Sequence, residues 1–165
     1  MNLTEALEKL LCSFKRYYNI KKDDEVEKPF VAEAIFRSHN EQYFLIKKAK
    51  VAEINSNEDV FFYTTENLDL ETLNSLDVCA WERGLSRVNP DGNHRNSDVT
   101  LIIIADTIQA DAMKAVRKMK HYKSYCFGLH GWSSYRLVAI ELSTGELAYN
   151  RQGQNLKKLV SNITK

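Results

Sequence analysis

The sequence is poor in the residues that interrupt regular structure. It has two prolines and six glycines in 165 residues, and it contains no low-complexity tract or internal repeat. Long disordered segments are therefore not expected, and the one short tether that we expect is the charged stretch 20–28. With 44% hydrophobic and 27% charged residues, the chain has the size and composition of one globular domain, which we take to be 1–165.

The sequence also lacks a long apolar run. No segment approaches the ~20 apolar residues of a membrane span, and Met1–Glu8 carries acidic residues where a signal peptide would begin with positive charge. We therefore expect no membrane partner and a cytoplasmic location. The cysteines Cys12, Cys79 and Cys126 are odd in number and far apart, which is typical of a reducing compartment and indicates neither a disulfide framework nor a zinc knuckle.

Familiar catalytic signatures are missing as well. The sequence has no Walker loop, dinucleotide fingerprint, H-E-x-x-H, C-x-x-C or G-x-S-x-G motif. We therefore assign no metal site, and both the identity of any cofactor and whether the protein is an enzyme stay open at this point.

Acidic residues are scarce in the last third of the chain. The net charge of the whole chain is only +1, but residues 1–111 hold 13 Lys and Arg against 20 Asp and Glu, net −7, whereas residues 112–165 hold 10 against 2, net +8. No acidic residue occurs from 112 to 140. A basic region of this kind indicates an anionic partner, nucleic acid among them. The alternatives are a solvated face or pairing with the acidic part of the same chain.

What the sequence does contain is one uninterrupted aliphatic run, Leu101–Ile104, inside the segment 98–106. The run is short, rich in isoleucine and bounded by polar residues, which favours a strand over a helix. Because a strand projects side chains to both faces, this one needs cover on both sides. We predict that it lies in the middle of the sheet.

The remaining elements follow from hydrophobic periodicity. The sequence predicts helices over 3–18, 68–85, 108–121 and 154–163, and strands over 30–37, 42–54, 60–63, 98–106, 124–130, 135–142 and 147–150, with turns at 38–41, 55–58 and 143–146. The element order αβββαβαβββα predicts an α/β (α+β) fold: a mixed sheet with an N-terminal antiparallel meander and helices on both faces.

The first six of these elements run in an order similar to that of the restriction-endonuclease-like core. This resemblance implies strand carboxylates that hold Mg²⁺ with a lysine close by. The corresponding places hold Glu33 and then Leu45-Ile46-Lys47, where the second acid is missing. The resemblance thus implies a relative of that fold without a complete active site, and a cross-strand ion pair accounts for Glu33 and Lys47 equally well.

Three further residues are candidates for catalysis. His94 lies in the polar loop 87–98 that leads into the central strand, and Asp106 lies at the carboxyl end of that strand, where open α/β sheets bind ligands. A helix N-cap is the other explanation for Asp106. His130, in a glycine-flanked turn, is a candidate general base or a turn residue. A hydrolase site would require these three side chains to converge in one cleft with those of Glu33 and Lys47.

A basic stripe is the main candidate for binding. Lys114, Arg117, Lys118 and His121 recur at i, i+3, i+4 and i+7, which predicts one side of the helix 108–121. Lys120 and several aromatic residues lie close by in sequence, a combination that holds phosphates and stacks bases. The predicted binding residues are Arg95, Lys114, Arg117, Lys118, His121, Lys123, Trp132 and Arg136.

Three functions fit these observations. The first is a binding or interaction domain that engages an anionic partner through its basic C-terminal third. The second is a metal-dependent hydrolase or nuclease. The third is a structural protein that forms a homo-oligomer, with the aromatic stretch 122–135 buried between copies.

Overall fold

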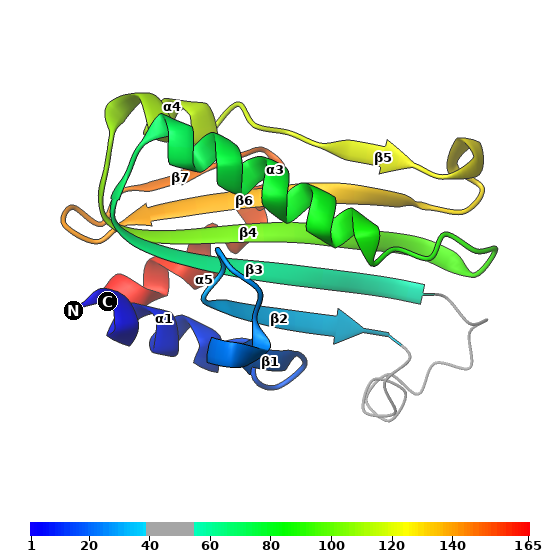
Figure 1. The fold of residues 1–165 in the computed structure, drawn as a ribbon, viewed down its shortest axis with the longest axis horizontal. Coiled ribbons are helices and arrows are strands. Elements are labelled where there is room, and N and C mark those ends of the chain that lie inside the picture. The colour runs from blue at the N-terminus through cyan, green and yellow to red at the C-terminus, as the bar shows by residue number, and fades with distance from the viewer. Residues whose placement is uncertain (39–54) are drawn as a thin grey trace.

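A mixed β-sheet runs the length of the molecule (Figure 1). The computed structural model describes residues 1–38 and 55–165, and within them the sheet has seven strands in the order β1-β2-β3-β4-β6-β5, with β7 also paired to β6. The strands are β1 (Asn19–Lys22), β2 (Ala32–Arg37), β3 (Asn55–Leu68), β4 (His94–Ile108), β5 (Tyr122–Ser124), β6 (Trp132–Glu141) and β7 (Leu147–Tyr149). β3, β4 and β6 are parallel to one another, whereas the strands at both edges run antiparallel to their neighbours.

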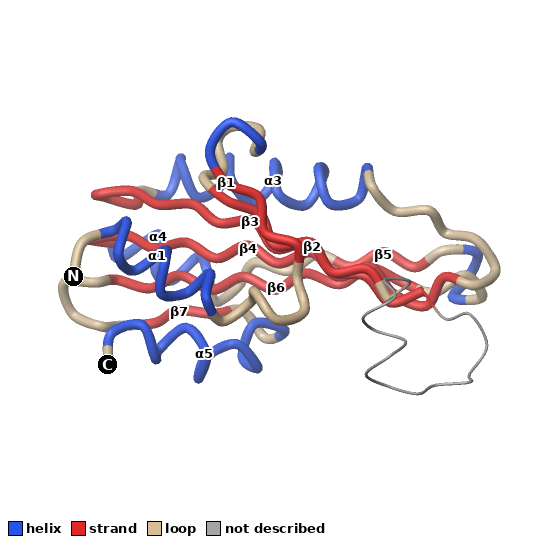
Figure 2. Tube along the Cα trace, turned by 90° about the horizontal axis from the view of Figure 1, so that it is seen from below, coloured by secondary structure: helices blue, strands red, loops and turns tan. Residues whose placement is uncertain are grey.

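Helices cover both faces of this sheet (Figure 2). On one face lie α1 (Leu3–Cys12) and α5 (Lys157–Ser161), and α5 is flanked by the 3₁₀ turns Gln152–Leu156 and Asn162–Thr164. On the other face lie α3 (Leu70–Ser86) and α4 (Ala110–Val116). α3 connects β3 to β4 and α4 leads from β4 towards β6, and crossovers of this kind are what parallel strands require.

The predicted central strand is confirmed. β4 lies between β3 and β6, with Ile103 paired to Tyr63 on one side and to Ala139 on the other. The side chains of Leu101–Ile104 are fully buried and alternate between the two hydrophobic cores. Each such side chain contributes roughly 1.5–3 kcal/mol on burial, which explains why the aliphatic run lies in the centre of the sheet.

The order of the described strands and α-helices is the predicted αβββαβαβββα, and the α+β class with one mixed sheet is confirmed. One strand of the N-terminal meander, however, is formed by other residues than predicted. β1 falls at the start of the expected tether 20–28, where Ile20 pairs with Ala34. Lysines suit this position because it is an exposed edge of the sheet. The predicted strand 42–54 lies outside the described residues.

The predicted turn at 55–58 is wrong, because these residues begin β3. Their polar side chains bond across the sheet instead of closing a turn. Ser56 Oγ donates to Asn96 Oδ1 at 2.8 Å, and Thr100 Oγ1 donates to Glu58 Oε1 at 2.9 Å. A polar strand is stable here because its neighbours supply hydrogen-bond partners.

The predicted helix 108–121 is too long, since α4 ends at Val116. Lys114, Arg117, Lys118 and His121 therefore do not line one helix face. Like charges at i, i+3 and i+4 weaken a helix, which fits the early end. Nor does Asp106 cap α4, because the N-cap residue is Gln109 and it makes no side-chain capping bond.

Other boundaries differ from prediction, and the helix predicted over 3–18 already ends at Cys12. The polar loop 87–98 is shorter, because β4 already begins at His94. The predicted strand 124–130 is replaced by β5 and the 3₁₀ turn Cys126–Gly128. The closing helix 154–163 is divided into α5 and its 3₁₀ turns. Among the helices of the described residues, none combines the length and the hydropathy needed to cross a membrane.

Candidate functional site

The outer edge of β6 is covered in two pieces, with a gap between them. β5 pairs with Trp132–Ser134 and β7 pairs with Val138–Ile140. In the gap, the buried side chain of Asn150 takes the place of a strand: its Oδ1 accepts the Leu137 N–H at 3.0 Å and its Nδ2 donates to the Tyr135 carbonyl at 3.1 Å. The same amide also bonds the Gly153 N–H and the Met119 carbonyl. Four bonds from one side chain fix both segments that flank the gap.

A cavity of about 480 Å³ opens at this gap. It lies within the size range of small-molecule sites. Residues from the chain entering β5, from β6 and from the chain leaving β7 line it: Lys120, His121, Tyr122, Ser134, Tyr135, Asn150, Arg151 and Gln152. We call this space the β5–β7 cavity.

Two cations border the β5–β7 cavity from opposite sides. Lys120 precedes β5 and Arg151 follows β7, and both are exposed. Neither forms an ion pair with any residue that the structure describes, and no carboxylate is among the lining residues. Two unpaired positive charges therefore border the cavity.

His121 is held rigidly at the wall of the β5–β7 cavity. Its Nε2 lies 2.8 Å from Oδ2 of the buried Asp77, its ring stacks on Trp81 at 5.1 Å between centroids, and it meets the Tyr135 ring edge-on at 4.9 Å. Asp77 and Trp81 are four residues apart on α3 and so share one helix face. Burial, and then the charge of Asp77, raise the pKa of Tyr135 well above its ordinary value, so this phenol stays neutral.

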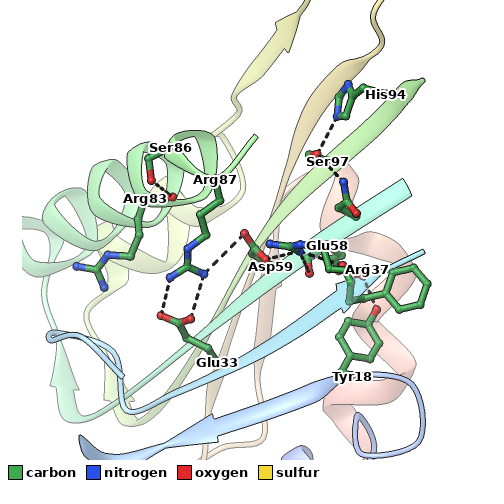
Figure 3. Close-up of polar contacts among 12 residues, drawn as sticks. Tyr18, Glu33, Arg37, Glu58, Asp59, Arg83, Ser86, Arg87, His94 and Ser97 are labelled. Atoms are coloured by element: carbon green, nitrogen blue, oxygen red, sulfur yellow. Dashed lines mark hydrogen bonds and ion pairs between the residues drawn. The ribbon is translucent and has the colours of Figure 1, made fainter. Parts of the chain in front are cut away.

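His94 and His130, both predicted as catalytic candidates, lie close together, but their rings hold the surrounding loops in place. His94 is buried, and its Nδ1 donates to the His130 carbonyl at 2.6 Å. Its Nε2 bonds the Ser97 hydroxyl at 2.8 Å (Figure 3). His130 Nδ1 bonds the Pro90 carbonyl at 2.9 Å. Both nitrogens of His94 are thus occupied, and this pair joins the loop before β4 to the turn before β6.

Glu33 is buried and neutralised by an arginine. Arg87 donates to it twice, at 3.0 and 3.2 Å, and also lies 3.7 Å from Asp59, which Arg37 contacts at 2.7 Å (Figure 3). Burial alone lowers the pKa of Arg87, but its bonds to Glu33 and the nearby carboxylate charges raise that pKa above its usual value. The charges of the two carboxylates and the two guanidinium groups cancel, so the four side chains form a neutral internal ion-pair network.

Arg136 is engaged in a second ionic cluster, on the α1 face of the same strands. Its two terminal nitrogens contact Glu58 and Asp98 at 3.0 Å each. Glu58 also accepts a bond from the Tyr18 hydroxyl. Burial, and then the charge of Glu58, raise the pKa of that phenol. Arg136, a predicted binding residue, is therefore paired inside the molecule.

The described candidates for a hydrolase do not share one cleft. Asp106 is twelve residues along β4 from His94, a separation of ~40 Å at ~3.3 Å per residue. Glu33 is engaged with Arg87, and Lys47 lies outside the described residues. The described chain also contains no cluster of acidic, histidine or cysteine residues that could hold a metal ion.

The predicted binding residues are spread over the C-terminal part of the fold. Of that set, His121 lines the β5–β7 cavity. Arg117 pairs with Glu146 at 3.1 Å, and Lys123 lies 5.6 Å above the Tyr125 ring. Lys114 is exposed on α4 and Lys118 is exposed just after its end, while Arg95 and Trp132 lie near the starts of β4 and β6. Only part of the basic stripe therefore reaches the cavity.

Sequence reasoning missed Asp77, Asn150 and Arg151. Asp77 lies on α3, 44 residues before its partner His121, so no local spacing connects the two. Asn150 ends a predicted strand, where an asparagine ordinarily indicates a turn. No local sequence pattern distinguishes Arg151 from the other residues of the basic region.

A sequence comparison with known protein families identifies the family of this chain. A family model described as "Domain of unknown function (DUF8052)" matches residues 2–162. No curated protein and no solved structure gives a significant match. Since the match covers nearly the whole chain, this protein belongs to the DUF8052 family.

Proposed function

We propose that this protein is a binding domain that holds a small anionic ligand in the β5–β7 cavity. The observation that carries the proposal is the pair of cations, Lys120 and Arg151, at a cavity whose lining includes no carboxylate. An anion placed between them gains two favourable charge interactions. Arg151 adds geometric preference, because a guanidinium group presents two parallel donors to a phosphate or carboxylate.

The neighbouring side chains support a ligand that also carries a flat ring. Tyr122 lines the cavity, and 68% of its surface is exposed. An exposed aromatic beside cations is the combination that stacks nucleobases while phosphates are held. His121 contributes a ring whose position Asp77 and Trp81 already fix, so ordering it on binding costs little entropy.

Carboxylates of the same chain pair with few of the lysines and arginines of residues 112–165. In the described part of the chain, Arg117 and Arg136 are the arginines and lysines of 112–165 that form ion pairs. The others are exposed without a carboxylate partner among the described residues: Lys114, Lys118, Lys120, Lys123, Arg151, Lys157, Lys158 and Lys165. A basic region that the chain leaves unpaired supports an anionic partner over intramolecular pairing.

The test is a calorimetric titration at low salt with inorganic phosphate, pyrophosphate and a mononucleotide. We expect binding that weakens as salt is added. Lys120→Gln and Arg151→Gln should each weaken it by about tenfold or more, since a hydrogen bond to a charged group contributes about 1.5–3 kcal/mol and 1.4 kcal/mol is tenfold. Lys114→Gln, on α4 outside the cavity, is the matched control.

Two results would contradict the proposal. One is the absence of binding by all three probes at low salt. The other is an equal loss from Lys114→Gln, which would assign the anion to a diffuse basic surface. A short single-stranded oligonucleotide tested in parallel shows whether a nucleic acid is the natural ligand: its affinity should exceed that of the mononucleotide and fall steeply with salt.

We also propose a cytoplasmic location for this binding. The support is that Cys12, Cys79 and Cys126 are all free thiols, which suits a reducing compartment. Fractionation of cells that express the tagged protein tests this location.

A further inference from the structure

The turn between β5 and β6 presents apolar side chains to solvent in a constrained backbone. Cys126, Phe127 and Gly128 have consecutive positive φ values of 50°, 54° and 88°. The side chain of Phe127 is fully exposed, at 103%, and that of Leu129 is 78% exposed. We call residues 125–131 the apolar tip. Left-handed backbone at a phenylalanine is unfavourable and persists only where the surroundings enforce it.

Several hydrogen bonds enforce this conformation. The N–H of Tyr125 donates to the Gly131 carbonyl at 2.9 Å, and the Tyr125 carbonyl accepts from Gly128 at 2.9 Å and from His130 at 3.2 Å. The His130 ring fastens the tip to Pro90. A Cβ on Gly131 would lie 2.0 Å from the Arg95 carbonyl, so the tip also packs tightly against the start of β4.

A rigid turn that displays Phe127 and Leu129 has the properties of a binding hot spot. Its apolar groups are already ordered, so burying them against a partner costs little conformational entropy. The tip is convex, and it therefore needs an apolar groove as its counterpart. Lys123 and Arg95 flank it, which favours a groove with an acidic rim.

The chain itself has such a groove, on α3. A space of about 400 Å³ is lined by apolar Pro29, Tyr63, Leu76 and Cys79, together with Thr72, Ser75 and Glu71. The segment that leads to Pro29 carries the exposed Asp23, Asp24 and Glu25. We call this the α3 groove. Among the lining residues of the groove the charged one is the acidic Glu71, whereas the tip is flanked by the basic Lys123, in line with the net charges of −7 and +8 of the two parts of the chain that hold them.

We propose that the apolar tip of one copy of this protein inserts into the α3 groove of a second copy. Tip and groove are different surfaces, so the contact is head-to-tail, and it closes into a ring or extends into a filament. Burial of Phe127 and Leu129 provides the attraction, and Lys123 opposite Glu71 sets the register. This assembly is independent of the anionic ligand proposed above.

Sedimentation velocity over a range of protein concentrations tests the assembly. We expect the average mass to rise above that of one chain as concentration increases, and to fall with added salt. Phe127→Ser with Leu129→Ser should remove the tip, and Ser75→Trp should fill the groove from an exposed helix position. Each variant should weaken association by about tenfold or more. Tyr17→Ser, an exposed aromatic on the α1 side, is the control and should have no effect.

A mixing experiment identifies the two surfaces as partners. The Phe127→Ser/Leu129→Ser chain keeps its groove and the Ser75→Trp chain keeps its tip, so an equimolar mixture should form a one-to-one dimer that cannot extend. Lys123→Glu should weaken wild-type assembly and Lys123→Glu with Glu71→Lys should restore it.

Three results would overturn the proposal. They are a wild-type chain that stays monomeric at every concentration, assembly unaffected by either variant, and no dimer in the mixture. The first would show that tip and groove do not associate, and the second would assign the assembly to another face. Circular dichroism spectra of the variants, matched to wild type, exclude unfolding as the cause of any loss.

Discussion

The Asp77 carboxylate bonds His121 across the boundary between α3 and the chain entering β5, with 2.8 Å between Oδ2 and Nε2. Asp77 is buried and His121 borders the β5–β7 cavity. This bond joins an internal charge to the wall of the proposed binding site. The geometry of the cavity therefore depends on a residue that no ligand reaches.

Asp77→Ala should lower both the stability and the anion affinity of the protein. The change leaves His121 without its hydrogen-bond partner, which costs about 1–3 kcal/mol of unfolding free energy, and frees the ring to rotate. Urea unfolding and phosphate titration measure the two effects. Glu82→Ala, on an exposed position of α3, is the control. Full anion affinity in a folded Asp77→Ala protein would show that His121 takes no part in binding.

Asn150→Ala should be among the more destabilising single changes at the cavity. It removes four hydrogen bonds at once and leaves the buried Leu137 N–H without a partner, whereas the Gly153 N–H keeps its bond to the Asn150 main-chain carbonyl. A cost of about 1–3 kcal/mol follows from the one unsatisfied buried donor. Urea unfolding measures it, against Asn155→Ala on an exposed position nearby. A loss below 1 kcal/mol (about the value of one net hydrogen bond) would contradict the role given to Asn150.

The stability of the protein should fall in alkali. Tyr18 and Tyr135 have raised pKa values in the folded state, mainly because they are buried. Above about pH 10, the unfolded chain releases the protons of these phenols while the folded chain retains them. The stability that they contribute is therefore complete below that pH and is lost as the pH rises, by up to about 1.4 kcal/mol per pH unit for each tyrosine.

Urea unfolding at a series of alkaline pH values measures this slope. Tyr18→Phe should make the slope shallower, and it also removes the bond to Glu58. Tyr17→Phe, at the exposed neighbouring position, is the matched control. An equal slope in the Tyr18→Phe and Tyr17→Phe proteins would be evidence against the burial of Tyr18.

Gly131→Ala should destabilise the protein more than Gly145→Ala. Both glycines have positive φ, 81° and 77°, so both changes carry the cost of left-handed backbone, about 1–2 kcal/mol. At Gly131 the added carbon also meets the Arg95 carbonyl at 2.0 Å, whereas at Gly145 it meets open space. The difference in melting temperature between the two variants isolates this steric clash. Equal melting temperatures would mean that the apolar tip is not held against β4.

The sequence pattern was sufficient where burial follows a simple period. Leu101–Ile104 predicted β4 because four consecutive aliphatic residues suit a strand that is covered on both faces. The pattern failed at β1 and at the start of β3, where the strands are formed by charged and polar residues. Their stability comes from the neighbouring strands and from bonds such as that of Ser56 to Asn96. Such partners are distant in sequence and leave no local period.

The residues of the candidate site could likewise be predicted only in part. The scarcity of acidic residues after position 111 indicated a basic region, and it includes Lys120 and Arg151. The helical spacing from Lys114 to His121 was misleading, because α4 ends first. The cavity exists because β5 and β7 cover separate parts of β6, and strand pairing of that kind is a property of the whole sheet.

The two chain termini lie together at one end of the molecule, and the apolar tip lies at the other (Figures 1 and 2). Lys9 Nζ of α1 donates to the Ile163 carbonyl at 3.1 Å, which joins the first helix to the last turn. A short glycine linker can therefore connect residue 165 to residue 1, and new ends can be opened in the exposed turn 143–146. Such a circularly permuted chain would keep the sheet, both cores and the cavity, and would place its new ends in the turn between β6 and β7, away from the cavity lining.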